Sequence, residues 1–591
     1  MVRQNTKTPA PCGSWPSPIT PELAAGATGT LDYPVCDGDM LYWLESHPEN
    51  KGRNTIMRLR RLPASGSTST SLSQAPIPAD PGSVEEVLPA PLNAHSRVHE
   101  YGGRPYTVKD GILYFVEQDD QRIYRLDTTS PKGLPEALSP EGQGLRFAEL
   151  SLDLTRDRLI AVCEQHSSTQ GEPENFIAAI SLDGSQSLKK LVAGADFYAY
   201  PCLSPDASSL AWISWQHPNM PWDSTTLEVA SFDAEGAICE LEPSPTRLSM
   251  GGDNESIVQL KWSPDGSLFF VSDHSEWWNL YRLSTKTLAA HSSDSSSHIK
   301  TTSLCPMAAE FATPLWTLGM SNYAIDDSNS DDKRVNAQTI LTAYTQEGRW
   351  HLGLLDAPQT GSPGSLQPIT TAYSQISALS AQGGRAWFIA ASPQHGSELV
   401  EIDLATQDMV TLRQIAVPAV DLKHFSQPQA LHYPTTQHDT AHGFYYPPTH
   451  PEYCPRQDEV PPLIALCHGG PTGATSTALS YKVQFWTNRG FAVADFNYRG
   501  STGFGRQYRD KLKLEWGRAD VDDIVAGVEY LCKQGLADPD RLLIRGSSAG
   551  GYTVLAALAF TDTFRAGASL YGIGDLETLA RDTHKFEARV F

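Results

Sequence analysis

A short apolar run that ends in a glycine- and serine-rich motif constrains this chain more than any other stretch. Residues 542–545 read Leu-Leu-Ile-Arg, residues 546–550 read Gly-Ser-Ser-Ala-Gly, and an apolar, helix-forming run follows at 554–560. This order predicts a strand, a sharp turn and a helix, with Ser548 at the apex of the turn. A serine held there exposes its hydroxyl, which favours a nucleophile. The alternative is an ordinary turn between a strand and a helix.

The residues around this motif alternate between strands and helices, after a predicted opening hairpin at 429–446. A helix is predicted at 520–533, because its apolar residues recur on one face. Alternation of this kind predicts a parallel sheet with helical crossovers. The predicted buried strands are 463–467, 491–496, 541–545 and 566–571.

Two further loops leave the carboxyl ends of these strands, where open α/β sheets place their ligands. His468-Gly469-Gly470-Pro471 follows the first buried strand, and its glycines let backbone N–H groups approach a substrate. Together with the N–H of Ala549, such a loop builds an oxyanion hole. The alternative is a glycine turn needed only for chain reversal. His468 precedes the serine, which is the wrong order for a hydrolase triad, so a structural role is expected for it.

The third loop, residues 498–505, is predicted to border the pocket. Arg499 in this loop is a candidate ligand for a substrate carbonyl or carboxylate. The alternative is an arginine that ties loops together.

The long region from about residue 40 to residue 404 has a different sequence pattern. Short apolar or alternating runs are divided by Gly, Pro, Asp and Ser, which predicts strands. Two runs share a Ser-Pro-Asp lead-in, at 203–206 and 262–266. Such recurrence favours a seven-bladed β-propeller over a pair of β-sandwiches, because radial closure avoids long exposed edges. The seven runs are 40–44, 112–116, 158–162, 210–214, 268–272, 340–344 and 386–390.

Charge and cysteine content exclude several function classes. The 591 residues carry a formal net charge of -23, which argues against nucleic-acid binding. No apolar run is long enough to cross a bilayer, and no secretory signal is expected at the N-terminus. The nine cysteines form no CxxC pairs, so neither a metal site nor a disulfide framework is expected. These features predict a cytoplasmic protein without a cofactor.

The three loop motifs together resemble those of the prolyl oligopeptidase family of serine peptidases. They are His468 to Pro471, the Asn-Tyr-Arg-Gly-Ser-Thr-Gly stretch at 497–503, and the Gly-Ser-Ser-Ala-Gly-Gly-Tyr stretch at 546–552. The most similar branch is that of the acylaminoacyl-peptidases and dipeptidyl-aminopeptidase-like enzymes. The stretch at 97–103 and the Ser-Pro-Asp lead-ins are similar to the propeller of that branch.

This resemblance implies a propeller that covers an α/β-hydrolase domain and excludes large folded substrates. It implies cleavage of short peptides through an acyl-enzyme, with Ser548 as the nucleophile and the backbone amides of Gly470 and Ala549 as oxyanion donors. A carboxylate on a propeller loop, Glu100, is a candidate for holding the free amino terminus of a substrate. The alternative for Glu100 is a brace within a blade.

The family's catalytic acid and histidine lie beyond two further strands after the nucleophile, and here only 43 residues follow Ser548. His584 resembles part of a helix without a catalytic role in the family. We therefore expect a C-terminally incomplete hydrolase domain that lacks its last strands. The predicted segments are an irregular N-terminal stretch at 1–35, the propeller at 36–425 and the hydrolase domain at 426–591. An esterase and a catalytically inactive peptide-binding protein are the alternative functions.

Overall fold

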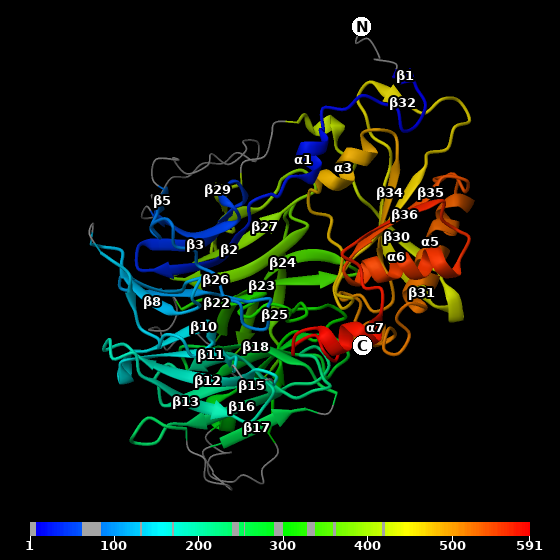
Figure 1. The fold of residues 1–591 in the computed structure, drawn as a ribbon. Coiled ribbons are helices and arrows are strands. Elements are labelled where there is room, and N and C mark those ends of the chain that lie inside the picture. The colour runs from blue at the N-terminus through cyan, green and yellow to red at the C-terminus, as the bar shows by residue number, and fades with distance from the viewer. Residues whose placement is uncertain are drawn as a thin grey trace.

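A computed structural model describes residues 7–61, 84–130, 133–167, 171–238, 247–252, 254–288, 299–327, 337–358, 362–415 and 420–590 (Figure 1). Two bodies share the chain. Seven four-stranded antiparallel sheets form the first, and a six-stranded mixed sheet with its helices forms the second. This confirms the predicted combination of a seven-bladed propeller and an α/β-hydrolase domain.

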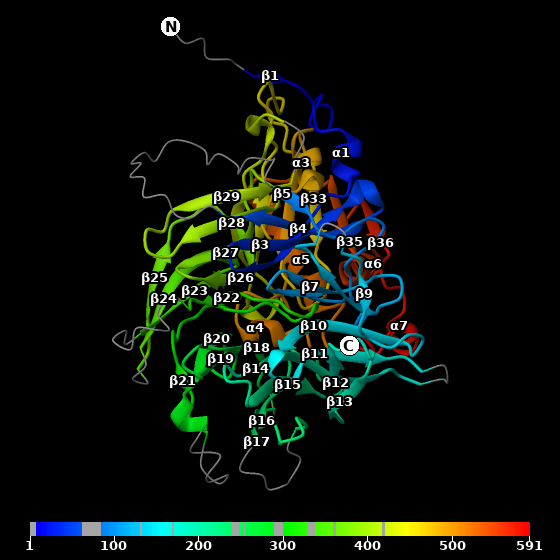
Figure 2. The same cartoon turned by 90° about the vertical axis from the view of Figure 1, so that its left-hand side faces the viewer.

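The seven blades follow one another along the chain. Figure 2, in which the propeller faces the viewer, shows their sheets fanned about a common axis. Blades one to three are β2 (Leu31–Asp37), β3 (Met40–His47), β4 (Arg53–Arg60) and β5 (Val84–Glu86); β6 (Tyr106–Lys109), β7 (Ile112–Val116), β8 (Ile123–Asp127) and β9 (Glu136–Ala137); β10 (Leu145–Asp153), β11 (Arg158–Gln165), β12 (Glu174–Ser181) and β13 (Leu188–Ala193). Blades four and five are β14 (Phe197–Leu203), β15 (Ser209–Trp215), β16 (Thr226–Ser231) and β17 (Arg247–Gly251); β18 (Ile257–Trp262), β19 (Leu268–Ser272), β20 (Asn279–Leu283) and β21 (Thr302–Ser303). Blades six and seven are β22 (Tyr323–Ile325), β23 (Ala337–Gln346), β24 (Arg349–Pro358) and β25 (Ser365–Ile369); β26 (Gln375–Gln382), β27 (Arg385–Ala391), β28 (Glu398–Asp403) and β29 (Met409–Gln414).

The apolar runs found in the sequence are the second strands of these seven blades. Each is buried between a first and a third strand, which explains its continuous hydrophobic character. The ring closes by packing of the first blade on the last: Trp43 and Trp387 share one core, and Arg413 Nη2 lies 2.6 Å from Glu45 Oε1. A pair of β-sandwiches is therefore excluded.

The first strand of five blades carries a β-bulge next to the axis. At each bulge one non-glycine residue has a φ between 49° and 59°, and the register shifts there. A bulge turns the strand and re-aims the neighbouring side chains. First strands of neighbouring blades contact one another, so these bulges surround the propeller axis. The bulge residues are Tyr33, Glu149, Tyr200, Gln259 and Ala378.

The second body is built on the sheet β30-β31-β34-β33-β35-β36. Its last four strands are parallel, and β31 is antiparallel to β34, as the alternating sequence predicts. The strands are β30 (Gln429–Pro434), β31 (Thr440–Tyr446), β33 (Leu463–Cys467), β34 (Ala492–Asn497), β35 (Leu542–Ser547) and β36 (Ala566–Leu570). The helices are α3 (Tyr481–Thr487), α4 (Arg506–Asp510), α5 (Ala519–Lys533), α6 (Ala549–Phe560) and α7 (Leu576–Asp582).

The predicted irregular segment at 1–35 is more ordered than its Pro- and Gly-rich composition indicates. It contains β1 (Thr8–Pro9), which pairs with β32 (Tyr453–Cys454), and α1 (Pro21–Ala25), and β2 of the first blade begins at Leu31. Ile19 packs with Phe425 and Tyr481 of the second body. A five-residue helix is too short to show a periodic pattern in a sequence, which explains the difference.

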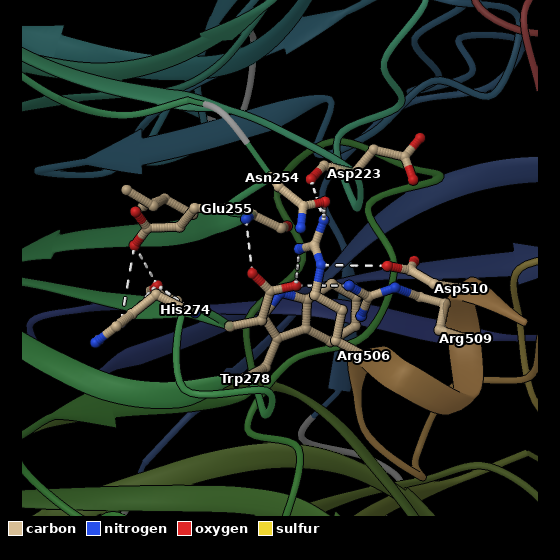
Figure 3. A network of polar contacts seen from close by, with 12 residues as sticks. Asp223, Asn254, Glu255, His274, Trp278, Arg506, Arg509 and Asp510 are labelled. Atoms are coloured by element: carbon tan, nitrogen blue, oxygen red, sulfur yellow. Dashed lines mark hydrogen bonds and ion pairs between the residues drawn. The ribbon is translucent and has the colours of Figure 1, made fainter.

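Helix α4 attaches the second body to the propeller through a buried network (Figure 3). Asp273 Oδ2 lies 2.6 Å from Arg506 Nη1 and 2.5 Å from Arg509 Nη2, and all three side chains are buried. Glu310 accepts hydrogen bonds from the backbone N–H groups of Gly505 and Trp278. Burial raises the pKa of the Glu310 carboxyl to about 7.

Across the described ranges, no helix has both the length and the apolar character that crossing a membrane requires.

Candidate active site

Ser548 occupies the bend between a strand and a helix. Strand β35 ends at Ser547, helix α6 begins at Ala549, and Ser548 between them has φ 53° and ψ −123°. A non-glycine residue in this region of backbone space is strained, and such residues concentrate at functional sites. The bend is held by hydrogen bonds from Ser548 N to Leu570 O at 3.1 Å and from Gly551 N to Ser548 O at 2.9 Å.

The glycines of the motif are needed for this close approach of strand and helix. A Cβ on Gly546 would lie 2.3 Å from the carbonyl oxygen of Gly550, and a Cβ on Gly550 would lie 2.3 Å from that of Cys467. A Cβ on Gly551 would lie 2.6 Å from Gly572 Cα. All three distances are shorter than non-bonded carbon contacts allow. The sequence therefore folds into the bend that the motif predicts.

The glycine loop after β33 lies beside Ser548. A Cβ on Gly469 would lie 3.7 Å from Ser548 Cβ, which is ordinary van der Waals contact. Neither the amide of Gly470 nor that of Ala549 donates a hydrogen bond within the described part of the chain. Two free backbone donors thus belong to the two segments that meet at the serine. Such donors can stabilise a developing oxyanion.

His468 does not face the serine in this structure. Its Nε2 lies 2.7 Å from Ser501 Oγ, its Nδ1 lies 2.8 Å from Gly469 O, and its ring stacks on Tyr498 with centroids 4.3 Å apart. Burial lowers the pKa of the imidazole to about 4. The ring is thus neutral at pH 7 and both of its nitrogens are engaged, as expected for a structural histidine.

The side chain of Arg499 forms an ion pair and hydrogen bonds inside the hydrolase domain. Its side chain is 3% exposed, its Nη2 lies 2.8 Å from Asp523 Oδ1, and its backbone N–H donates to Asp523 Oδ2 at 2.6 Å. Its Nη2 also donates to Thr436 Oγ1 at 2.8 Å. These contacts match the alternative of an arginine that ties loops together, because the guanidinium has almost no surface left for a substrate.

Glu100 lies on a propeller loop and is paired with arginines. Its Oε1 is 2.6 Å from Arg146 Nη1, its Oε2 is 3.8 Å from Arg97 Nη2, and its side chain is 38% exposed. The neighbouring Tyr101 packs against Trp316. The carboxylate is therefore accessible, but its charge is already balanced by Arg146.

A cavity of about 370 Å³ lies between the two bodies, next to the glycine loop. Trp316 of the propeller donates from Nε1 to Thr472 O at 2.6 Å, one residue after the loop. The sequence did not identify this cavity, because its walls come from segments up to 471 residues apart and none of them carries a motif. Its lining includes Asp32, Trp316, Trp350, Gln375, Thr475 and Thr502.

No described residue hydrogen-bonds to Ser548 Oγ. His584 instead lies 3.5 Å from Glu587 Oε2 and packs its edge on Tyr101. Asp575 caps helix α7 by accepting from the N–H groups of Glu577 and Thr578. Among the described residues, no cluster of His, Cys, Asp and Glu could hold a metal ion.

Comparisons with known proteins agree with this geometry. The prolyl oligopeptidase family matches residues 477–591. A puromycin-hydrolyzing peptidase of Mycobacterium tuberculosis has a similar structure, with a TM-score of 0.85, 36% sequence identity, and an alignment that covers 99% of this chain and 83% of that one. The crystal structure of a puromycin hydrolase has a TM-score of 0.85 and 34% identity, and the alignment covers 98% of this chain and 83% of that one.

Among curated proteins, Dipeptidyl aminopeptidase BIII of Pseudoxanthomonas mexicana is 37% identical over 137 residues, which are 23% of this chain and 20% of that protein. Dipeptidyl peptidase family member 6 of Caenorhabditis elegans is 38% identical over 120 residues, or 16% of its length. The matched segments thus span a fifth or less of these curated relatives. The glycine loop, the serine bend, the propeller and the identity over the whole fold lead to one conclusion: the chain belongs to the prolyl oligopeptidase family.

Proposed function

We propose that this protein is a serine peptidase that hydrolyses short peptides through an acyl-enzyme on Ser548. One observation carries the proposal: Ser548 stands on a positive-φ bend, and the free amides of Gly470 and Ala549 belong to the two segments that meet there. A hydroxyl on such a bend is presented to solvent rather than buried in the sheet.

In this proposal Ser548 Oγ attacks the carbonyl carbon of the scissile peptide bond and its hydroxyl proton passes to a base. The amides of Gly470 and Ala549 donate to the oxygen of the tetrahedral adduct. Collapse of the adduct expels the amine with a proton, and water then hydrolyses the ester. Losing one oxyanion donor typically lowers turnover by a factor of ~10²–10³.

The interdomain cavity supports short peptides as the substrate class. Its volume of about 370 Å³ suits a few residues. The buried contacts of Arg506 and Arg509 with Asp273 hold the propeller against the hydrolase domain, which limits access for folded proteins. To bind the free amino terminus of a substrate, Glu100 must exchange its contact with Arg146 for one with the substrate ammonium.

A catalytically inactive peptide-binding protein is the second candidate function. It is favoured by one observation: no described residue hydrogen-bonds to Ser548 Oγ, and a serine without a base is a weak nucleophile at neutral pH. An esterase is the third, because the same bend and amides serve ester hydrolysis. Peptide and ester substrates compared at equal concentration would separate the first function from the third.

Labelling with a fluorophosphonate tests the proposal directly. We expect the probe to label the folded protein, labelling to vanish in Ser548→Ala, and labelling to persist in the matched control Ser547→Ala. Release of amine from puromycin and from short peptides then measures turnover. Folded protein that stays unlabelled, or labelling that survives Ser548→Ala, would overturn the peptidase proposal and favour the binding protein.

We also infer a cytoplasmic location and no binding of nucleic acid. Eight described cysteines are unpaired, as is usual in a reducing compartment. The net charge of -23 opposes contact with phosphates. Cell fractionation and a gel-shift assay with random DNA check these two points.

A further inference from the structure

A second cavity lies on the axis of the propeller. It has a volume of about 430 Å³ and is lined by the bulged first strands of several blades. It shares part of its wall with the interdomain cavity, so the two are adjacent. The shared residues are Tyr33, Met320, Ser321 and Ala378.

Arg104 lines this cavity and has no hydrogen-bonding or ion-pair partner for its side chain among the described residues. The Nε of its guanidinium is buried. Two arginines that are more deeply buried than Arg104 do have carboxylate partners: Arg499 is paired with Asp523, and Arg506 is paired with Asp273. An unpaired cation beside a cavity is costly unless an anion joins it.

Lys261 supplies a second cation to the same wall. Its Nζ donates to Ser321 Oγ and to Tyr323 O, both at 2.6 Å. An ammonium has three N–H donors, so one remains for a ligand. Burial, followed by the repulsion from Arg104, lowers the pKa of the Lys261 ammonium to about 7.

Glu149 is the one carboxylate among the described residues that line the cavity. It accepts from Tyr200 N at 2.6 Å and forms no ion pair with Arg104 among the described residues, although the nearby charge of Arg104 acts to lower the pKa of its carboxyl. Burial raises the pKa of the Glu149 carboxyl to about 7. At pH 6 the wall therefore carries two cations and a mostly protonated acid, whereas well above pH 7 it carries one cation and one anion.

The remaining titratable groups of the wall stay neutral through this range. Burial raises the pKa values of the Tyr33 and Tyr200 hydroxyls and of the Cys202 thiol far above neutrality. Asp32 borders the adjacent cavity, and burial raises the pKa of its carboxyl to about 6. Its ionisation adds a negative charge near the cavity as the pH rises through that value.

We propose that the propeller-axis cavity binds the carboxylate of a short peptide through Arg104 and Lys261. A guanidinium holds a carboxylate with two parallel hydrogen bonds, and a neighbouring ammonium adds a third. The cavity volume lies within the range of small-molecule sites. The adjacent interdomain cavity extends from this site to Gly473, just after the glycine loop that lies beside Ser548. The choice of a peptide as ligand depends on the proposed peptidase function, whereas the anion site itself does not.

Calorimetric titration of the full Ser548→Ala chain tests the site without any turnover. Triglycine is compared at pH 6 with triglycinamide, which has the same length and amino terminus but no carboxylate. We expect one triglycine to bind per chain, and triglycinamide to bind at least tenfold more weakly. Charged hydrogen bonds contribute about 1.5–3 kcal/mol, so Arg104→Gln and Lys261→Met should each weaken binding by about 10- to 100-fold.

The matched control is Arg97→Gln, which removes an exposed arginine from the preceding loop and should leave the affinity for triglycine unchanged. Thermal melts show whether each variant is folded; if Arg104→Gln does not fold, Lys261→Met and the comparison of the two ligands decide. The affinity for triglycine should fall by at least tenfold from pH 6 to pH 8.5.

Equal binding of triglycine and its amide, or unchanged affinity in both folded cavity variants, would overturn the proposal. Chloride that competes as strongly as triglycine would also overturn it, because the site would then take any small anion. The titrations use the Ser548→Ala chain, so their results do not depend on catalysis by Ser548. A protein that binds triglycine but fails to label with fluorophosphonate would keep the anion site and lose the peptidase function.

Discussion

Neutralising Asp273 should loosen the contact between helix α4 and the propeller. Its carboxylate accepts from Arg506 Nη1 at 2.6 Å and from Arg509 Nη2 at 2.5 Å, in a buried setting. In Asp273→Asn both guanidinium groups lose their nearest anion. Removing one partner of a buried ion pair costs about 3–5 kcal/mol, because the remaining charge stays in a medium of low dielectric.

The other contacts of the two arginines decide where the loss falls within that range. Arg506 keeps Asn254 Oδ1 at 2.8 Å and Asp510 Oδ2 at 3.4 Å. Arg509 keeps the Trp278 ring, 4.4 Å from its Cζ, while its Nε and Nη1 have no partner among the described residues. Since Arg506 stays partly compensated, we expect a loss of about 3 kcal/mol, the lower end of the range.

Hydrogen exchange of the α4 amides measures this loss locally, without assuming that both bodies unfold together. A loss of about 3 kcal/mol corresponds to exchange about 100-fold faster. The matched control is Asp510→Asn, because Asp510 is partly exposed and lies 3.4 Å from Arg506 Nε. Such a pair contributes less than about 1 kcal/mol. Equal exchange rates in the two variants would refute the view that Asp273 holds the bodies together.

Three further predictions concern the site and its surroundings. Gly550→Ala should abolish fluorophosphonate labelling and lower the melting temperature, because the new Cβ would lie 2.3 Å from Cys467 O; unchanged labelling would contradict the tight bend. His468→Gln should lower the melting temperature through the lost contact with Ser501 yet leave measurable labelling; complete loss of labelling in folded protein would make His468 the base. The Glu310 carboxyl has a pKa of about 7 in the folded protein and about 4.3 in the unfolded chain. Between these two pH values the folded state therefore binds more protons than the unfolded state. As a result, this group lowers the free energy of unfolding as the pH rises from about 4.3 to 7. Urea unfolding at pH 5 and at pH 8 measures how the free energy of unfolding changes with pH. Glu310→Gln should remove the part of this change that Glu310 causes, and an unchanged pH dependence would contradict the assignment.

Features that are encoded locally could be predicted from the sequence. The bend at Ser548 needs only a strand, three glycines and a helix in succession, and all of them are adjacent in the chain. The second strand of each blade could be recognised in the sequence as an apolar run, because it is buried on both faces. The Ser-Pro-Asp lead-ins are turns between first and second strands, in which Ser204 Oγ donates to Asp206 and Ser263 Oγ donates to Asp265.

Features assembled from distant segments could not be predicted. Arg104 lies just before β6 and Lys261 lies in β18, 157 positions further on, and no local pattern separates them from surface cations. The same holds for Asp273, whose partners Arg506 and Arg509 lie in the other body. The sequence left two roles open for Arg499, because only the fold shows how closely the chain brings Asp523 to it.

The oxyanion geometry at Ser548 is tested most directly by a crystal structure of the fluorophosphonate adduct. We expect phosphorus bonded to Ser548 Oγ, and the phosphonyl oxygen within about 2.7–3.1 Å of the backbone nitrogens of Gly470 and Ala549. A phosphonyl oxygen that points to solvent, or that is held by groups other than these two amides, would contradict the proposed catalytic site.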